Sequence, residues 1–225
     1  MEALENPVWE ALNSIDKRLN LGDDIVSYFD ETVSPFVGLS TWDDASQQYA
    51  MDILPEGRSW SVMVSEPVTF SNNINIVFSI PLYQMDCSDF MPIQLNGVDV
   101  RPLTALNVPE MLVLTELTKP GPFLDRTIDF GNYIGLFENN KLVAMAGERL
   151  HLNTHTEISA VCTDPKHLGK GYGAHLVSIL CTKIIKGGRT PFLHVRQDNL
   201  RAIEMYKRLG FLIRTDMYFA VFKVK

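Results

Sequence analysis

Three glycines lie between two apolar segments in the second half of the chain, and this pattern restricts the fold more than any other. The segment before them, "TEISAVCT" (156–163), has the composition of a strand. The glycines are Gly169, Gly171 and Gly173. From the last of them onward, small and apolar residues recur at helical spacing, at Gly173, Leu176, Val177, Leu180 and Ile184. We therefore predict a strand, a glycine-rich loop and a helix with one buried face.

A glycine-rich loop that opens a helix is suited to hold an anion, because free backbone N–H groups and the helix dipole point at the same place. The loop is not a P-loop, since Lys170 is followed by Gly171 and no Ser or Thr is available for magnesium. It is not a dinucleotide fingerprint either, because the third glycine is misplaced. Lys166 and Lys170 add positive charge, so a pyrophosphate without a metal fits best. His175 lies off the apolar face, and we expect it to be exposed.

The composition argues against several other classes of protein. The three cysteines, Cys87, Cys162 and Cys181, form no C-x-x-C pair, so neither a disulfide framework nor a zinc site is predicted. No apolar run approaches the roughly 20 residues of a membrane span. The opening "MEALENPVWE" lacks the basic-then-apolar order of a signal peptide. We therefore expect a soluble, cytoplasmic protein with no bound metal and no membrane partner.

The net charge of −7 is unevenly distributed along the chain. Residues 1–90 carry 15 acidic and 3 basic side chains, whereas residues 91–225 carry 12 and 17. One interpretation is that the acidic half attracts a cationic partner and the basic half a polyanionic ligand. The other is that the two halves only complement each other. The basic residues are dispersed and form no aromatic–basic motif, so nucleic-acid binding is not predicted.

The first 95 residues show a weaker pattern than the rest. Residues 9–20 have helical apolar spacing, and residues 59–67 and 74–80 are typical of strands. Near residue 95 the pattern loosens and the charge balance changes sign. We therefore predict an N-terminal α/β region of unknown role over residues 1–95 and a separate domain over residues 96–225.

The second region contains both strands and helices in a regular order. We predict strands at 98–103, 156–163, 192–196 and 217–224, and helices at 107–118, from the glycine loop to Lys186, and at 199–210. Residues 133–150 are expected to form a hairpin that turns at Asn139-Asn140. Together these elements predict an α+β fold with a mostly antiparallel sheet and one parallel strand–helix–strand unit.

The strand "TEISAVCTDP", the loop "HLGKGYGAHL" and the later helix "NLRAIEMYKRLGF" together resemble the GNAT superfamily of N-acetyltransferases. The loop alone is weak evidence. The loop together with the later helix is strong evidence, because both segments must contact the same acyl-CoA. The resemblance covers roughly residues 97–225. It implies a twisted, mostly antiparallel sheet flanked by helices. Residues 1–95 lie outside it, and one interpretation is that they are a degenerate GNAT-like half.

The resemblance implies acetyl-CoA or another acyl-CoA as co-substrate, and no metal. In the family pattern Q/R-x-x-G-x-G/A, Gly171 and Gly173 match, while Leu168 stands where Gln or Arg is usual. By position, the residues expected to bind the pyrophosphate are Leu168, Gly169, Lys170, Gly171, Tyr172, Gly173 and Ala174. The residues expected to contact the pantetheine arm are Val161, Cys162 and Thr163, with Asn199 on the other side of the cleft.

Acyl transfer to an amine needs a base for the amine, a donor for the carbonyl oxygen and an acid for the leaving thiolate. Tyr206 stands where the family has its general acid. Glu157, fourteen residues before Gly171, matches the glutamate base of the histone-acetylating branch. A half-buried carboxylate there is expected to have a raised pKa. Glu148 and a chain of water molecules are the alternatives, and Cys162 is not expected to become acylated.

The resemblance thus implies an enzyme that transfers an acetyl or other short acyl group to a primary amine, directly within a ternary complex. The acceptor and the acyl chain length stay open, as does the choice between a monomer and a homodimer. The alternative is a non-catalytic acyl-CoA sensor that uses its acidic N-terminal half as an interaction surface. The presence of both an acid and a base candidate favours the enzyme.

Overall fold

The computed structural model describes residues 3–65 and 74–224. Its main strands are β3 (Ser59–Val64), β4 (Asn75–Cys87), β5 (Asp99–Pro102), β6 (Ile134–Glu138), β7 (Lys141–His151), β8 (His155–Thr163), β9 (Thr190–Arg196) and β10 (Phe211–Lys223). Its α-helices are α1 (Pro7–Leu12), α2 (Asp44–Ile53), α3 (Val108–Thr118), α4 (Tyr172–Lys186) and α5 (Leu200–Arg208). These elements form the mixed α/β architecture that the sequence pattern predicts.

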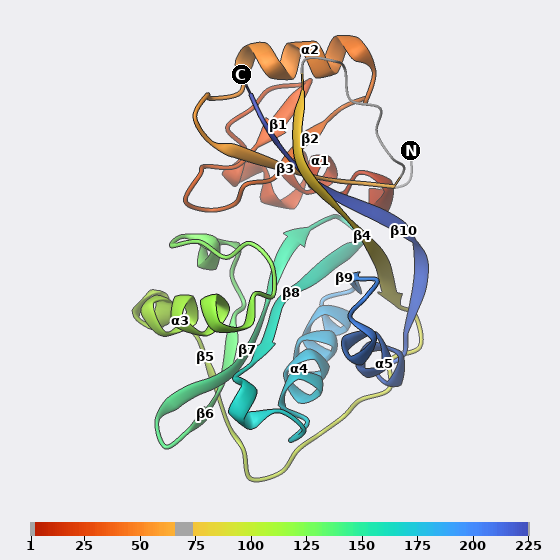
Figure 1. The fold of residues 1–225 in the computed structure, drawn as a ribbon. Coiled ribbons are helices and arrows are strands. Elements are labelled where there is room, and N and C mark those ends of the chain that lie inside the picture. Colours follow the sequence, from red (N-terminus) through yellow and green to blue (C-terminus); the bar gives the residue numbers. More distant parts are fainter. Residues whose placement is uncertain (1–2, 66–73, 225) are drawn as a thin grey trace.

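The eight main strands form one sheet in the order β3-β10-β4-β9-β8-β7-β6-β5 (Figure 1). Every neighbouring pair is antiparallel except β8 and β9, which are parallel and are joined by α4. The sequence prediction of a mostly antiparallel sheet with one parallel strand–helix–strand unit is therefore confirmed. The turn between β6 and β7 has φ values of 50° at Asn139 and 59° at Asn140, as a two-residue hairpin of this kind requires.

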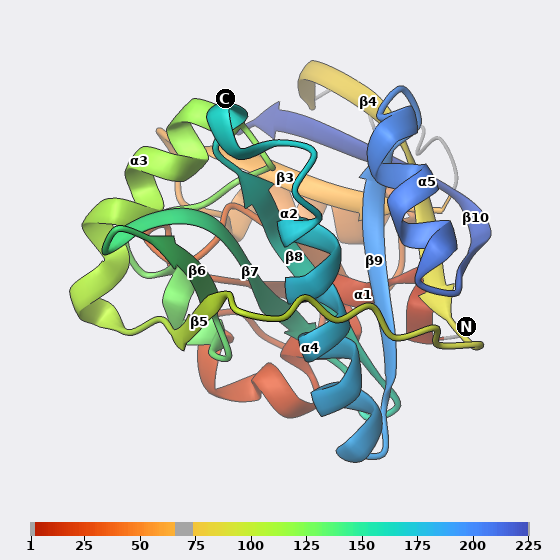
Figure 2. The ribbon, with the colours of Figure 1, turned by 90° about the horizontal axis from the view of Figure 1, so that it is seen from below.

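The two faces of the sheet are covered by different helices. Met145 of β7 belongs to a buried cluster that includes Met111 and Leu114 of α3. Its neighbours Ala144 and Ala146 belong to a second cluster, built largely on α4 and α5. Because successive side chains of a strand point to opposite faces, α3 lies on one face and α4 with α5 on the other (Figure 2).

The N-terminal part differs most from the predicted elements. The helix expected over residues 9–20 is wrong as one helix, because α1 ends at Leu12 and a short 3₁₀-helix, η2 (Ile15–Leu19), follows. Between the two, Ser14 leaves the helical region of backbone space, with φ −129° and ψ −109°. A small two-stranded sheet of β1 (Val26–Tyr28) and β2 (Val37–Leu39) has no counterpart in the predicted elements, nor has α2.

Three strand predictions have the right type but different ends. The strand expected at 74–80 continues to Cys87, and the last strand begins at Phe211 rather than at residue 217. The strand expected at 59–67 is found to Val64, while residues 66 and 67 lie outside the described residues. The long β4 and β10 both run from the upper part of the molecule into the lower part (Figure 1).

Sheet hydrogen bonding crosses the boundary predicted near residue 95. β3 pairs with β10, and β4 pairs with both β9 and β10, so residues before 95 supply two strands of the main sheet. The segment between β4 and β5 then crosses α4 (Figure 2). There the Leu95 N–H donates to His175 Nδ1 at 3.2 Å, and the Ile93 N–H donates to Ser178 Oγ at 2.9 Å. His175 is therefore buried, and the expectation that it is exposed is wrong.

Candidate functional site

The two parallel strands at the centre of the sheet diverge beyond their first residues. The β8–β9 pairing ends at Glu157 and Phe192, although β8 continues to Thr163 and β9 to Arg196. Ala160 of β8 has a φ of 52°, a left-handed conformation that is costly for alanine and changes the direction of the strand. The two strands are therefore not paired with each other along their C-terminal parts.

The glycine loop follows β8 directly and leads into the N-terminus of α4. Gly169 and Gly171 have φ values of 85° and 79°, which only glycine adopts at low cost. Gly171 is also the N-cap residue of α4. The first N–H groups of α4 have no partner within the helix, so the loop and the helix terminus form an anion-binding geometry.

The structure brings two of the predicted contacts on β8 next to Gly173 of the loop, and Met205 of α5, which was not predicted, lies beside them. A Cβ atom placed on Gly173 would lie 3.8 Å from the side chains of both Val161 and Thr163. It would lie 3.5 Å from the sulfur of Met205 in α5. Residues of β8, of the glycine loop and of α5 therefore meet at the start of α4.

The side chains of the loop are tied to the hairpin turn between β6 and β7. Lys170 Nζ lies 2.7 Å from a carboxylate oxygen of Glu138, and the hydroxyl of Tyr172 donates to the same oxygen. His167 Nε2 lies 3.5 Å from the other oxygen. The positive charge expected from Lys170 is thus offset by a carboxylate that the sequence reasoning did not identify. Leu168 is exposed and contributes no polar group.

Helix α5 carries the predicted acid and one predicted contact of the pantetheine arm. Asn199 caps this helix, because its side chain accepts a hydrogen bond from the Ala202 N–H at 3.2 Å. Tyr206 is buried, and its ring packs edge-to-face on Phe211 with centroids 5.8 Å apart. Burial, with the nearby Cys162 thiol, raises the pKa of Tyr206 above its usual value of 10. The hydroxyl is therefore protonated at neutral pH and can donate a proton.

Cys162 lies on β8 and is buried. Burial raises the pKa of its thiol to about 12, although a hydrogen bond with Thr118 of α3 opposes the shift. Because the thiolate is the nucleophilic form, this cysteine is unreactive at neutral pH. The chemistry of the thiol therefore disfavours an acyl-cysteine intermediate at this position.

Glu157 is held by a buried ion pair with Arg149 of β7. The arginine donates to both carboxylate oxygens, from Nε at 2.7 Å and from Nη2 at 2.5 Å. Burial raises the pKa of Glu157, but the charge and the hydrogen bonds of Arg149 outweigh burial, and the pKa falls to about 2. The expected raised pKa is therefore wrong, because the expectation assumed a half-buried carboxylate without a cationic partner.

His194 of β9 supplies a third hydrogen bond to the Glu157 carboxylate, from Nδ1 at 2.7 Å. Its other nitrogen, Nε2, lies 3.0 Å from Nε2 of Gln84 on β4. The oxygen of Gln84 accepts from Arg214, and its amide nitrogen also donates to the carbonyl of Leu4. These contacts identify the Gln84 amide nitrogen as the donor to His194 Nε2, and His194 Nδ1–H as the donor to Glu157. Residues before position 95 thus complete the network around Glu157.

Glu148, the other base candidate, does not share a site with Glu157. Its carboxylate accepts from Asn132 Nδ2 at 2.7 Å and contacts His151 Nε2 at 3.0 Å. It lines a cavity together with Lys183 and Ile184 of α4, so it lies on the α4 face of the sheet. Arg149, the next residue along β7, points to the opposite face, where it meets Glu157.

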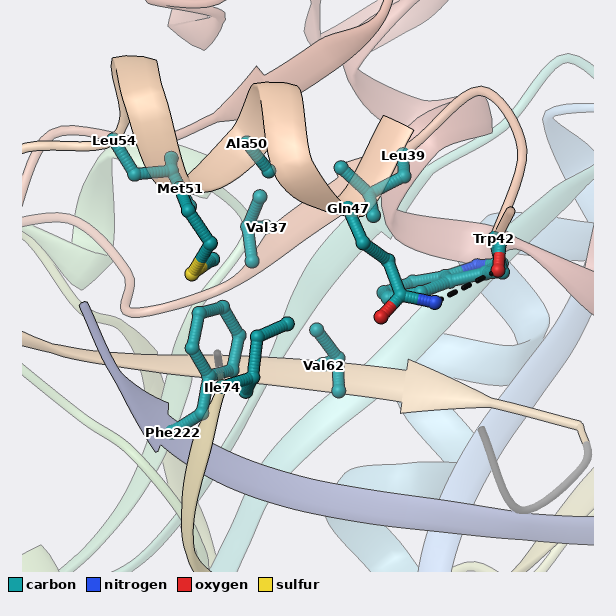
Figure 3. A pocket seen from close by; sticks show the side chains of 10 residues that line it. All are labelled: Val37, Leu39, Trp42, Gln47, Ala50, Met51, Leu54, Val62, Ile74 and Phe222. Atoms are coloured by element: carbon teal, nitrogen blue, oxygen red, sulfur yellow. Dashed lines mark hydrogen bonds between the residues drawn. The ribbon is translucent and has the colours of Figure 1, made fainter. Parts of the chain in front are cut away.

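A second hollow lies between α2 and the sheet, but it is too small and too apolar to be a binding site. Its volume is about 10 Å³, roughly the space of one water. The residues around it are Val37, Leu39, Trp42, Gln47, Ala50, Met51, Leu54, Val62, Ile74 and Phe222 (Figure 3). The Gln47 amide donates to the carbonyl of Trp42 at 2.9 Å. This hollow is a packing feature of the N-terminal part.

Two features are absent from the described residues. Over residues 3–65 and 74–224, no group of three or more His, Cys, Asp or Glu side chains is arranged to hold a metal ion. No helix in this part of the chain has the length and apolar character needed to cross a bilayer.

Comparison with known proteins agrees with this geometry. A family model described as FR47-like protein matches residues 133–220, which include the glycine loop and Tyr206. A solved structure from Novosphingobium aromaticivorans, assigned to the GNAT family of acetyltransferases, is similar over 99% of both chains, with a TM-score of 0.89 and 27% identity. The likeness therefore extends through the N-terminal part.

Two further proteins are similar at lower identity. A GCN5-related N-acetyltransferase from Kribbella flavida is similar over 95% of this chain and 93% of its own, with a TM-score of 0.68 and 18% identity, which shows a common fold. An uncharacterized protein of Mycobacterium leprae is 26% identical over an alignment 206 positions long, and the match covers 79% of this chain. The match covers 55% of that protein, so the chain spans about half the length of this curated relative.

Proposed function

Because the chain belongs to the GNAT superfamily, whose fold supports acyl transfer, we propose that it transfers an acetyl or other short acyl group from acyl-CoA to a primary amine. The observation that carries the proposal is the meeting of Gly173 with Val161, Thr163 and Met205, at the end of β8 that is not paired with β9. In this proposal the pyrophosphate binds at the helix terminus and the thioester binds beside the unpaired end of β8.

In the proposed complex, the backbone of residues 168–174 binds the pyrophosphate, and the β8 segment from Val161 to Thr163 binds the pantetheine arm. Asn199 contacts the arm from α5. The amine nitrogen attacks the thioester carbonyl carbon, and the carbon–sulfur bond then breaks. Tyr206 gives its proton to the departing thiolate, because its hydroxyl remains protonated at neutral pH.

The base that takes the amine proton is proposed to be Glu157 rather than Glu148. Glu157 is the last paired residue before β8 and β9 diverge, whereas Glu148 faces α4. With a pKa of about 2, Glu157 is ionised but weakly basic. A chain of water molecules is the alternative acceptor of the proton, and both alternatives use direct transfer without an acyl-enzyme.

A second candidate function is a non-catalytic acyl-CoA sensor. The bidentate pairing of Glu157 with Arg149 favours it, because that pairing depresses the basicity of the predicted base. An activity assay distinguishes the two functions. The protein is incubated with acetyl-CoA and a panel of amines, amino acids and peptide N-termini, and the release of free CoA is measured. Turnover with any acceptor supports the transferase; tight acetyl-CoA binding without turnover across the panel supports the sensor.

A further inference from the structure

A polar cavity of about 290 Å³ lies at the C-terminal end of α4, between that helix, β7 and η2. By the same measure a single water requires roughly 10–15 Å³, so the cavity can hold a small molecule. The 15 residues of α4 separate it from the glycine loop by about 20 Å. The cavity is therefore distinct from the proposed acyl-CoA site at the other end of the helix.

An imidazolium with two carboxylate partners lies in the wall of this cavity. His151 Nδ1 lies 2.9 Å from Asp16, and Nε2 lies 3.0 Å from Glu148. Both ring nitrogens thus face carboxylate oxygens, which favours the doubly protonated ring. These hydrogen bonds outweigh burial and raise the pKa of His151 to about 9. The carboxylates of Asp16 and Glu148 are consequently occupied by His151.

Three further cations surround the cavity, each from a different segment. They are Arg18 of η2, Lys183 of α4 and Arg189, which follows α4. Arg18 donates to the carbonyl of Asp129, Lys183 to the amide oxygen of Asn132, and Arg189 to the hydroxyl of Thr156. All three acceptors are neutral.

Within the described residues, none of these three cations has a carboxylate within ion-pair distance. The cavity lining therefore carries four positive charges, including His151, against two negative charges. The whole chain has a net charge of −7, so this excess of positive charge is local.

The negative end of the α4 dipole explains part of this arrangement. Lys183 and Arg189 lie at the C-terminus of α4, where cations are stabilising. The dipole does not account for Arg18, because this residue belongs to η2 and not to α4. It does not account for the cavity itself either. We infer that this cavity is a binding site for a small multivalent oxyanion, such as a phosphate or a polycarboxylate.

The test is titration calorimetry of the full chain with inorganic phosphate and, separately, with citrate, at pH 7 and constant ionic strength. The double variant Lys183→Ala/Arg189→Gln should weaken binding at least tenfold. The matched control Lys186→Ala/Arg208→Gln removes the same charge from exposed positions outside the cavity and should change affinity less than twofold. Arg18→Gln, at an exposed position, serves as a second variant and should also weaken binding.

The glycine loop is a competing phosphate site, so Gly171→Asp is included in the same titration. Retention of phosphate binding in Gly171→Asp and its loss in Lys183→Ala/Arg189→Gln would support the cavity, whether or not the protein is a transferase. The inference is overturned if neither anion binds the unmodified chain, if the cavity variants and their control behave alike, or if Gly171→Asp abolishes the binding. If the double variant does not fold, the Arg18→Gln result decides.

Discussion

Arg149 and Glu157 form a bidentate ion pair between β7 and β8, at the point where β8 begins to leave β9. The side chain of Glu157 has no exposed surface and that of Arg149 only 10%. Removal of one partner from such a pair leaves an uncompensated buried charge. A substitution of Glu157 alone therefore combines the loss of a candidate base with the loss of a charge partner, and the two effects must be separated.

The first prediction separates them with a double-mutant cycle. Glu157→Gln should lower the free energy of unfolding by about 3–5 kcal/mol, because Arg149 remains buried and unpaired. The double variant Arg149→Met/Glu157→Gln should regain most of that loss, while kcat stays low in both variants if Glu157 is the base. Urea denaturation and CoA release, measured on the same samples with Arg149→Met alone as control, give the two readouts. Recovery of kcat together with stability would remove Glu157 from the chemistry and leave the water chain.

The second prediction concerns Tyr206, the proposed acid. Tyr206→Phe should lower kcat by roughly 10²-fold and leave acyl-CoA affinity almost unchanged, since general acids contribute about 10²–10⁴. The pKa of Tyr206 is raised by burial, so its protonated form persists and kcat should show no decline from this group up to about pH 9. The kcat of both proteins is measured across this pH range, and their affinity for acetyl-CoA is measured by calorimetry. Equal kcat in the two proteins would exclude Tyr206 as the acid.

The third prediction uses the two glycines that flank α4. Gly171 and Gly188 both have positive φ, at 79° and 76°, and added side chains meet little or nothing near either. An aspartate at either position should therefore cost a similar 1–2 kcal/mol of backbone strain. Only Gly171→Asp places a negative charge at the helix N-terminus, and only it should abolish acetyl-CoA binding in calorimetry. If the two variants had equal affinity for acetyl-CoA, the pyrophosphate would not bind at the glycine loop.

Local signals explain which parts of the fold could be predicted. Asn139 and Asn140 tolerate positive φ, so the hairpin turn was identifiable from two residues. The glycine loop and the apolar face of α4 are likewise encoded within short segments. β1 and β2 have only three residues each, too few for a periodic pattern, and they are held by packing against distant segments.

The environment of the candidate site could not be predicted, because distant segments build it. The pairing of Glu157 with Arg149 depends on the register of β7 and β8, which shifts between Glu148 and His151. A lone arginine in the apolar run "KLVAMAGERLH" does indicate that a buried partner is needed, but it does not say which one. His175 is covered by residues about eighty positions earlier in the chain, so its own helix carries no sign of its burial.

The fourth prediction follows from the contact of His151 with Asp16, which joins β7 to η2. The pKa of His151 is about 9 in the folded protein and near 6.5 when unfolded. A raised pKa stabilises the fold fully below the unfolded pKa, and the stabilisation is lost as pH rises through the folded pKa. The free energy of unfolding should therefore fall by about 3 kcal/mol between pH 6 and pH 10 because of this one group.

Urea denaturation at several pH values, compared between the unmodified chain and His151→Gln, isolates the contribution of this histidine. The variant should be less stable at pH 6, and the difference between the two proteins should shrink as the pH approaches 10. His155→Gln is the control, because burial lowers the pKa of His155 and confines its effect to lower pH. A difference that stays constant from pH 6 to pH 10 would mean that His151 is neutral in the folded protein and that its contacts with Asp16 and Glu148 do not form an imidazolium.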